Sequence, residues 1–211
     1  MGISKVAWQG EVLAVQPRIR LIRSFDQRNH AYPGFALLLR GRVGEEAERE
    51  FSVGIGPGAQ AKHAFRVGDT VRGLAVPIAD EHMESVELYK ASALDVVSRA
   101  ASSPAEGPPW RGVPPTLETY RDRGHRRLDP RTYQASCRSC IWGCRMPVVM
   151  IVDHWKPDVR ECRFETFCYG PKSCSAYRAG PTRKVPGRNG TTWEEEEWVD
   201  EEATSHRGPD E

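Results

Sequence analysis

The chain has 211 residues, of which 30 are Lys or Arg and 29 are Asp or Glu, so its formal net charge is +1. Only 39% of the residues are hydrophobic, and the 19 Gly and 16 Pro favour strands, turns and linkers over a helix bundle. This composition excludes a single large core and predicts one medium domain or two small ones.

Targeting signals are missing from the sequence. No run of 18 apolar residues occurs, which excludes a membrane-spanning helix, and the start Met1–Val6 has no apolar signal-peptide core. We therefore expect a cytoplasmic protein with no membrane partner. In that compartment the six cysteines are expected to act as metal ligands or core residues before they form disulfides.

Five strands are predicted in the first half of the chain. We expect them at residues 6–22, 36–44, 50–55, 70–78 and 88–97, with a turn-rich stretch at 26–34 and a short helix or turn at 59–65. The third predicted strand has the alternating pattern of a half-buried strand, since apolar Phe51, Val53 and Ile55 alternate with Ser52 and Gly54.

This order resembles an OB-fold barrel, in which a small helical insert separates the third and fourth strands. The stretch Phe65–Gly73 resembles the entrance to the fourth strand of that fold, and Leu88–Ser92 resembles its last strand. The resemblance covers about residues 5–97 and implies a mainly β protein with a five-stranded OB-like barrel. Another small β-barrel or a sandwich is the alternative.

Beyond the barrel the composition changes three times. Residues 98–116 are rich in Ala, Ser, Pro and Gly and are predicted to be a linker. Residues 117–192 contain all six cysteines and are predicted to be a basic, metal-binding module. Residues 193–211 form an acidic tail.

Charge is distributed unevenly between these parts. Residues 1–95 are net neutral, residues 96–192 carry 17 basic and 8 acidic side chains, and residues 193–211 carry 1 basic and 9 acidic side chains. The near-zero total is therefore a cancellation, and such asymmetry is typical of polyanion binding or of a tail with its own role.

A β-hairpin is predicted to separate the cysteines into groups. Residues 148–152 and 162–167 are expected to pair, with a turn near Pro157 and with Val148 opposite Phe167. Cys162 would then lie near the turn, about 16 Å from the open end at about 3.3 Å per residue. We exclude it as a ligand and expect it to pack as a small hydrophobe.

The remaining cysteines predict a metal-stabilised hairpin that resembles a zinc ribbon. Cys137 and Cys140, with Cys168 and Cys174, would hold a structural Zn(II), and Cys144 is a competing ligand. The five-residue gap between Cys168 and Cys174 departs from the paired C-x2-C of zinc ribbons. A [4Fe–4S] cluster on Cys137, Cys140, Cys144 and one later cysteine is the alternative cofactor.

Basic and aromatic residues around the cysteines predict nucleic-acid binding, since cations neutralise phosphates and aromatic faces stack on unpaired bases. The candidate ligand residues are Arg121, Arg123, Arg126, Arg127, Arg131, Arg183, Lys184, Arg188, Trp142 and Tyr169. RNA or another single-stranded nucleic acid is the expected partner.

Three roles remain open for the acidic tail. It could fold back onto the basic module and mask it, dock a basic protein partner, or stay disordered. Trp193, Trp198 and Val199 would anchor it in the first case.

Catalytic signatures are scarce. The sequence contains no G-x-S-x-G, no G-x4-G-K-[ST] and no H-E-x-x-H. We therefore expect a non-enzymatic nucleic-acid-associated protein, with an iron–sulfur redox or sensing protein and a protein-interaction adaptor as alternatives.

Overall fold

A computed structural model describes residues 4–24, 27–101, 107–153, 155, 156 and 158–211. The protein is mainly β, as expected, and most of its strands belong to one large mixed sheet that is partly closed into a ring. None of the helices in these ranges is both long and apolar enough to cross a membrane.

The ring is made by the first half of the chain. Its strands are β1 Val6–Arg23, β2 Arg28–Val43, β3 Arg49–Ile55, β4 Thr70–Pro77 and β5 Leu88–Ser98, with helix α1 Pro57–His63 between β3 and β4. β1 pairs with both β2 and β4, β2 pairs with β3, and β4 pairs with β5. One parallel pairing, Val53 with Leu88, joins β3 to β5.

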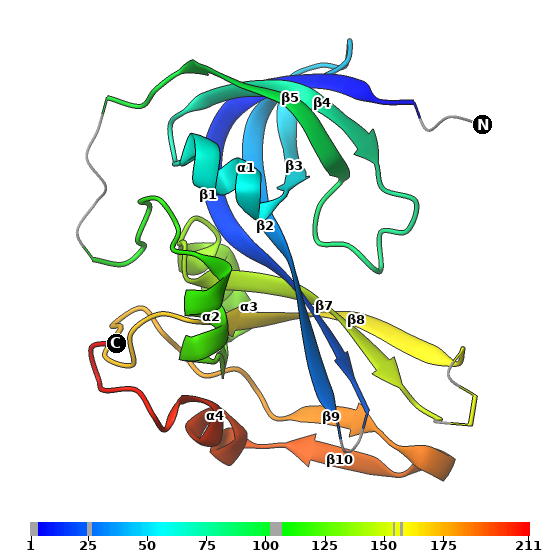
Figure 1. Ribbon diagram of the computed structural model, residues 1–211. Coiled ribbons are helices and arrows are strands. Elements are labelled where there is room, and N and C mark those ends of the chain that lie inside the picture. Colours follow the sequence, from blue (N-terminus) through cyan, green and yellow to red (C-terminus); the bar gives the residue numbers. More distant parts are fainter. Residues whose placement is uncertain (1–3, 25–26, 102–106, 154, 157) are drawn as a thin grey trace.

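β1 and β2 are far longer than typical strands of five or six residues, with 18 and 16 residues. Figure 1 shows both strands running from the ring into the lower half of the molecule, where Leu21 of β1 pairs with Val148 of a later strand. One sheet therefore crosses the predicted boundary between barrel and module.

The lower half holds the remaining elements. They are α2 Leu117–Arg123, β6 Arg126–Arg127, α3 Pro130–Thr132, a π-helical turn Tyr133–Cys137, β7 Gly143–Ile151, β8 Arg160–Cys168, β9 Arg183–Pro186, a 3-10 turn Arg188–Gly190, β10 Thr192–Glu195 and α4 Glu197–Thr204. β7 and β8 form the predicted hairpin and extend the large sheet, while β9 and β10 form a separate ribbon.

Apolar residues from both halves fill one continuous core, so the expectation that the composition excludes a single large core is wrong. Alternating side chains of β1, such as Val15, Ile19 and Leu21, pack with Met146 and Val148 of β7. The alternation of buried side chains along β1 continues beyond the ring. The C-terminal half therefore packs directly against β1 and is not joined to the ring through a linker alone.

Two details of the predicted strands are wrong. The stretch predicted as turns over residues 26–34 is β2 from Arg28 onward, because pairing with β1, such as His30 with Leu21, supplies its hydrogen bonds. The hairpin register is also different: Val148 lies opposite Arg163, and Phe167 lies opposite Cys144. β7 begins five residues before the β-branched run, at Gly143, and the predicted turn residue Pro157 lies outside the described residues.

Candidate metal centre

Cys137 and Cys140 lie on a turn that is fastened to β1. The amide of Gln16 on β1 donates hydrogen bonds of 2.9 Å to the backbone carbonyls of both cysteines. The hydroxyl of Tyr133 donates to the Gln16 side-chain oxygen at 2.7 Å, which orients the amide. The long first strand thus positions the first pair of thiols.

Gly143 closes this turn where no other residue fits. Its backbone N–H donates to the Cys140 carbonyl at 3.0 Å. A Cβ at this position would lie 2.4 Å from the carbonyl oxygen of Cys137 and 2.7 Å from the Gln16 amide nitrogen. Glycine therefore allows β7 to begin directly against the cysteine turn.

Cys168 and Cys174 come from the end of β8 and from the loop that follows it. Cys168 ends β8 and lies opposite Gly143, so strand pairing brings it beside the first turn. Cys174 follows a turn in which its N–H donates to the carbonyl of Pro171. The guanidinium of Arg126 donates to that same Pro171 carbonyl at 2.9 Å and holds the loop in place.

One small cavity of about 10 Å³ is lined by Cys137, Cys140, Cys168 and Cys174 together, the four cysteines predicted as zinc ligands. Its other walls include Trp110, Trp142 and Tyr177. A cavity of about this volume holds a single water-sized particle. Trp110 belongs to the segment predicted as linker, and here it covers the cysteines.

Burial governs the protonation of these thiols. It raises the pKa of Cys137 to about 12, helped by the neighbouring Cys168, and raises the pKa of Cys140 to about 11. Backbone amides oppose this effect, since those of Trp142 and Trp110 lower the pKa of Cys140. Donors aimed at sulfur favour the thiolate that a metal ion requires.

A backbone amide also donates to a sulfur atom of the second pair, Cys168 and Cys174. The Gly170 N–H donates to the Cys168 sulfur at 3.4 Å, two residues after the cysteine, as the Trp142 amide follows Cys140. In the described part of the chain, however, no group of three or more His, Cys, Asp or Glu side chains is arranged to hold a metal ion. The fold therefore brings four soft donors to one cavity without forming a complete coordination sphere.

Cys144 and Cys162 lie elsewhere. Cys144 is fully buried in the main core, and its thiol donates to the Pro17 carbonyl at 3.3 Å. It is not among the residues that line the cysteine cavity. Cys162 is exposed, with its sulfur 3.5 Å from the Met83 sulfur, so the expectation that it packs as a buried hydrophobe is wrong.

Most of the predicted nucleic-acid-binding cations turn inward. Arg126, Arg127 and Arg183 are buried, and Arg123 is half-buried against the Trp142 ring at 4.5 Å. Tyr169 is fully buried. The exposed candidates are Arg121, Arg131 and Lys184, Trp142 is half-buried, and the side chain of Arg188 lies outside what the structure describes.

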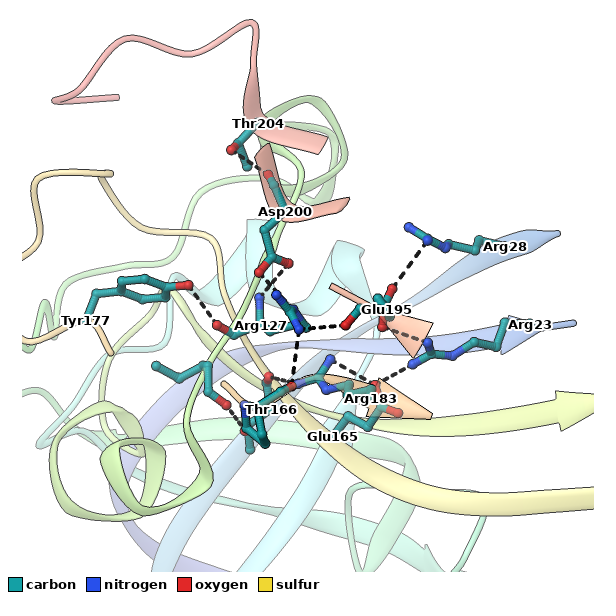
Figure 2. Close-up of polar contacts among 12 residues, drawn as sticks. Arg23, Arg28, Arg127, Glu165, Thr166, Tyr177, Arg183, Glu195, Asp200 and Thr204 are labelled. Atoms are coloured by element: carbon teal, nitrogen blue, oxygen red, sulfur yellow. Dashed lines mark hydrogen bonds and ion pairs between the residues drawn. The ribbon is translucent and has the colours of Figure 1, made fainter. Parts of the chain in front are cut away.

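The buried arginines belong to an ion network that sequence reasoning missed. Figure 2 shows Arg23 of β1 between two carboxylates: it donates to Glu165 of β8 and, at 2.8 Å, to Glu195 of β10. Arg183 of β9 lies 2.9 Å from Glu165, and Arg28 of β2 lies 3.4 Å from Glu195. Arg and Glu residues are common throughout the sequence, and the spacing of these five does not indicate that they form ion pairs with one another.

Arg127 makes a second buried pair. Its guanidinium and its own backbone N–H each donate to the Asp200 carboxylate at 2.9 Å, and it also donates to the Glu195 carbonyl at 2.7 Å (Figure 2). Burial raises the pKa of Asp200 despite the opposing effect of Arg127. For Glu195, burial also acts to raise the pKa, but Arg23 and Arg28 outweigh it and lower the pKa overall.

The acidic tail is therefore folded and docked by its charges. Residues 192–204 form β10 and α4, Val199 is buried, and Trp198 is half-exposed. Of the three roles left open for the tail, disorder does not hold for these residues. Removing the tail would leave Arg127 without Asp200 and would leave Arg23 with only Glu165. A truncated protein is therefore expected to be destabilised, so loss of the tail would not test masking alone.

Two histidines lie near this network. The rings of His30 and His125 are 5.0 Å apart. Burial, followed by the charges of Arg28 and Arg23, lowers the pKa of His30 to about 4, with Glu195 opposing. Burial likewise lowers the pKa of His125 well below its ordinary value, so both rings are neutral at pH 7.

No family model matches this sequence, and no curated protein or solved structure matches it either. Function is therefore inferred from the chain's own residues.

Glu165→Gln is expected to destabilise the protein by about 3–5 kcal/mol, because it leaves Arg23 and Arg183 buried without a full counter-charge. The matched control is Asp95→Asn, whose partner Arg72 is 59% exposed and whose loss should cost less than about 1 kcal/mol. Urea unfolding of both variants measures the difference. Equal, small losses would contradict a structural role for the network.

His30 predicts a loss of stability on acidification. The unfolded state takes up a proton near pH 6.5, whereas folded His30 does so only near pH 4, so stability falls across that window. The shift corresponds to about 3 kcal/mol at pH 4. His30→Gln should flatten this part of the pH profile, measured by urea unfolding from pH 7 to pH 4. The control His82→Gln, at an exposed position, should leave the profile unchanged. Parallel wild-type and His30→Gln profiles would refute the assignment.

Proposed function

We propose that this chain is a non-enzymatic protein that binds RNA or another single-stranded nucleic acid through an OB-like barrel, with a structural zinc ion in the cysteine module. The observation that carries the proposal is the ring of strand pairings β1-β2-β3-β5-β4, closed back onto β1. A single helix lies between β3 and β4. This is the strand order of OB-folds, which bind oligonucleotides on the face of strands 2 and 3.

The buried arginines reduce the number of cations in the cysteine module that a phosphate could contact. Arg127 and Arg183 are held by Asp200 and Glu165, so a phosphate would have to displace buried carboxylates to reach them. Exposed cations flank the first strands instead, among them Arg40 and Arg42 on β2. An OB-like barrel with cations on this side supports polyanion binding better than the module alone.

Zinc suits the cysteine cavity better than an iron–sulfur cluster. The cluster expected from the sequence needs Cys144, which instead packs in the main core with its thiol on Pro17. The four remaining thiols share one small cavity, which suits one tetrahedral ion. When bound, Zn(II) would hold all four as thiolates and contribute folding energy; the amides of Trp142 and Gly170 would help to stabilise that charge.

Metal analysis tests this site. Protein purified without oxygen is expected to carry about one zinc per chain and no colour. Cys137→Ser and Cys168→Ser should each lose the metal and melt at lower temperature, whereas the exposed Cys162→Ser should retain both metal and stability. A brown preparation with iron and sulfide would support the [4Fe–4S] alternative, and retention of zinc by Cys168→Ser would refute the ligand set.

Nucleic-acid binding is tested by fluorescence anisotropy with single-stranded RNA and DNA oligonucleotides. Affinity is expected to fall steeply with salt, with a slope of about −0.7 in log K against log salt for each phosphate contacted. Binding that is insensitive to salt, or no binding to any polynucleotide at low salt, would overturn the proposal.

A protein adaptor is the second candidate, favoured by one observation on the tail. Helix α4 turns Val199 and Asp200 inward and leaves Glu197, Glu201 and the half-exposed Trp198 outward. Such a surface suits a basic partner protein. Co-purification of a partner that resists nuclease treatment would support this role.

A further inference from the structure

A crevice separates the barrel from the cysteine module. A cavity of about 320 Å³ lies between Leu38 and Ser52 on the barrel side and Gln134, Arg138 and Arg145 on the module side. A second hollow of about 390 Å³ shares Leu38, Gln134 and Arg138 with the first and extends to Arg111. The two hollows are therefore joined along the face of β1 and β2.

The crevice has a net positive charge once the ion pairs of its two carboxylates are taken into account. Glu50 is shared by Arg138 at 2.8 Å and Arg40 at 3.1 Å, so one carboxylate faces two guanidinium groups. Glu87, the other carboxylate of the first hollow, is paired with Arg49 at 2.7 Å. The crevice thus has excess cations that its own carboxylates do not neutralise.

Arg145 is the most distinctive of these cations. Its guanidinium lies 3.7 Å from the centre of the Phe164 ring, which fixes its position, and the residue is exposed. Among the described residues neither Arg145 nor Arg111 has a carboxylate within ion-pair distance. A stacked, exposed arginine without a counter-charge is suited to bind an anion.

We propose that the crevice is the binding site for the single-stranded nucleic acid, with the unpaired Arg111 and Arg145 contacting its phosphates. This inference rests on the proposed function and adds the location of the strand. Two joined hollows accommodate several nucleotides, whereas an isolated phosphate would fill only a small part of one. Leu38 and Pro109 offer apolar surface for base faces, and Gln134 and Ser52 offer polar groups for base edges.

The test compares an arginine of the crevice with an exposed arginine elsewhere. Arg145→Gln removes the crevice cation stacked on Phe164. Arg72→Gln removes an exposed arginine of β4 that pairs with Asp95 at 2.7 Å and does not line the crevice. Both changes remove one charge from the full-length protein, and thermal melting confirms that each variant is folded.

Arg145→Gln is expected to weaken binding of a twelve-nucleotide single strand about tenfold and to reduce the salt slope by about 0.7, while Arg72→Gln stays within about twofold of wild type. Arg111→Gln should act like Arg145→Gln. Photocrosslinking of a thiouridine oligonucleotide should label peptides that contain Leu38 or Gln134.

Other outcomes overturn the proposal in separable ways. If the protein binds with the expected salt dependence but Arg145→Gln and Arg111→Gln behave as wild type, the location is wrong and the proposed function stands. If no polynucleotide binds, both fail. If inorganic phosphate displaces the strand at comparable concentration, the crevice is an anion pocket only. If poly-glutamate competes as well as the oligonucleotide, the occupant is an acidic protein.

Discussion

The buried carboxylates Glu165 and Glu195, with the guanidinium of Arg23 between them, determine how the rest of this molecule is assembled. They bring together the first strand, the cysteine hairpin and the C-terminal ribbon, which are remote in sequence. Burying such charges offers little net stability, since desolvation opposes the Coulombic gain. Leaving any one of them unpaired is costly, however, so the network favours a single arrangement of these elements.

This network also limits which cations could contact a polyanion under the proposed function. The basic module and the acidic tail have opposite net charges, and the structure shows part of that opposition used internally, by Arg127 with Asp200 and by Arg183 near Glu195. The cations left for a ligand are those without such partners, above all Arg145 and Arg111. Charge counted along the sequence therefore overstates the basic surface of the module.

The cysteine cavity and the crevice are physically connected. Arg138 stands between Cys137 and Cys140 in sequence, and the carbonyls of those cysteines are held by Gln16, which also lines the crevice. An ion bound by the thiols would therefore stiffen one wall of the proposed binding site. In this proposal the metal does not react with the bound nucleic acid. It holds the cysteine side of the crevice in a fixed position relative to β1.

The sequence by itself determined the mainly β class, four of the five ring strands to within one residue, the cysteine hairpin without its register, and the four cysteines that share a cavity; the second strand begins eight residues earlier than predicted. These follow from alternation, turn residues and ligand spacing, which are local properties. Only the tertiary structure decided that β1 and β2 continue into the lower half, that Cys144 belongs to the main core, and that Cys162 is exposed to solvent. It also decided which charges are paired, because Arg23 and Glu195 meet across 172 positions of sequence, and no local pattern encodes a contact between residues so far apart.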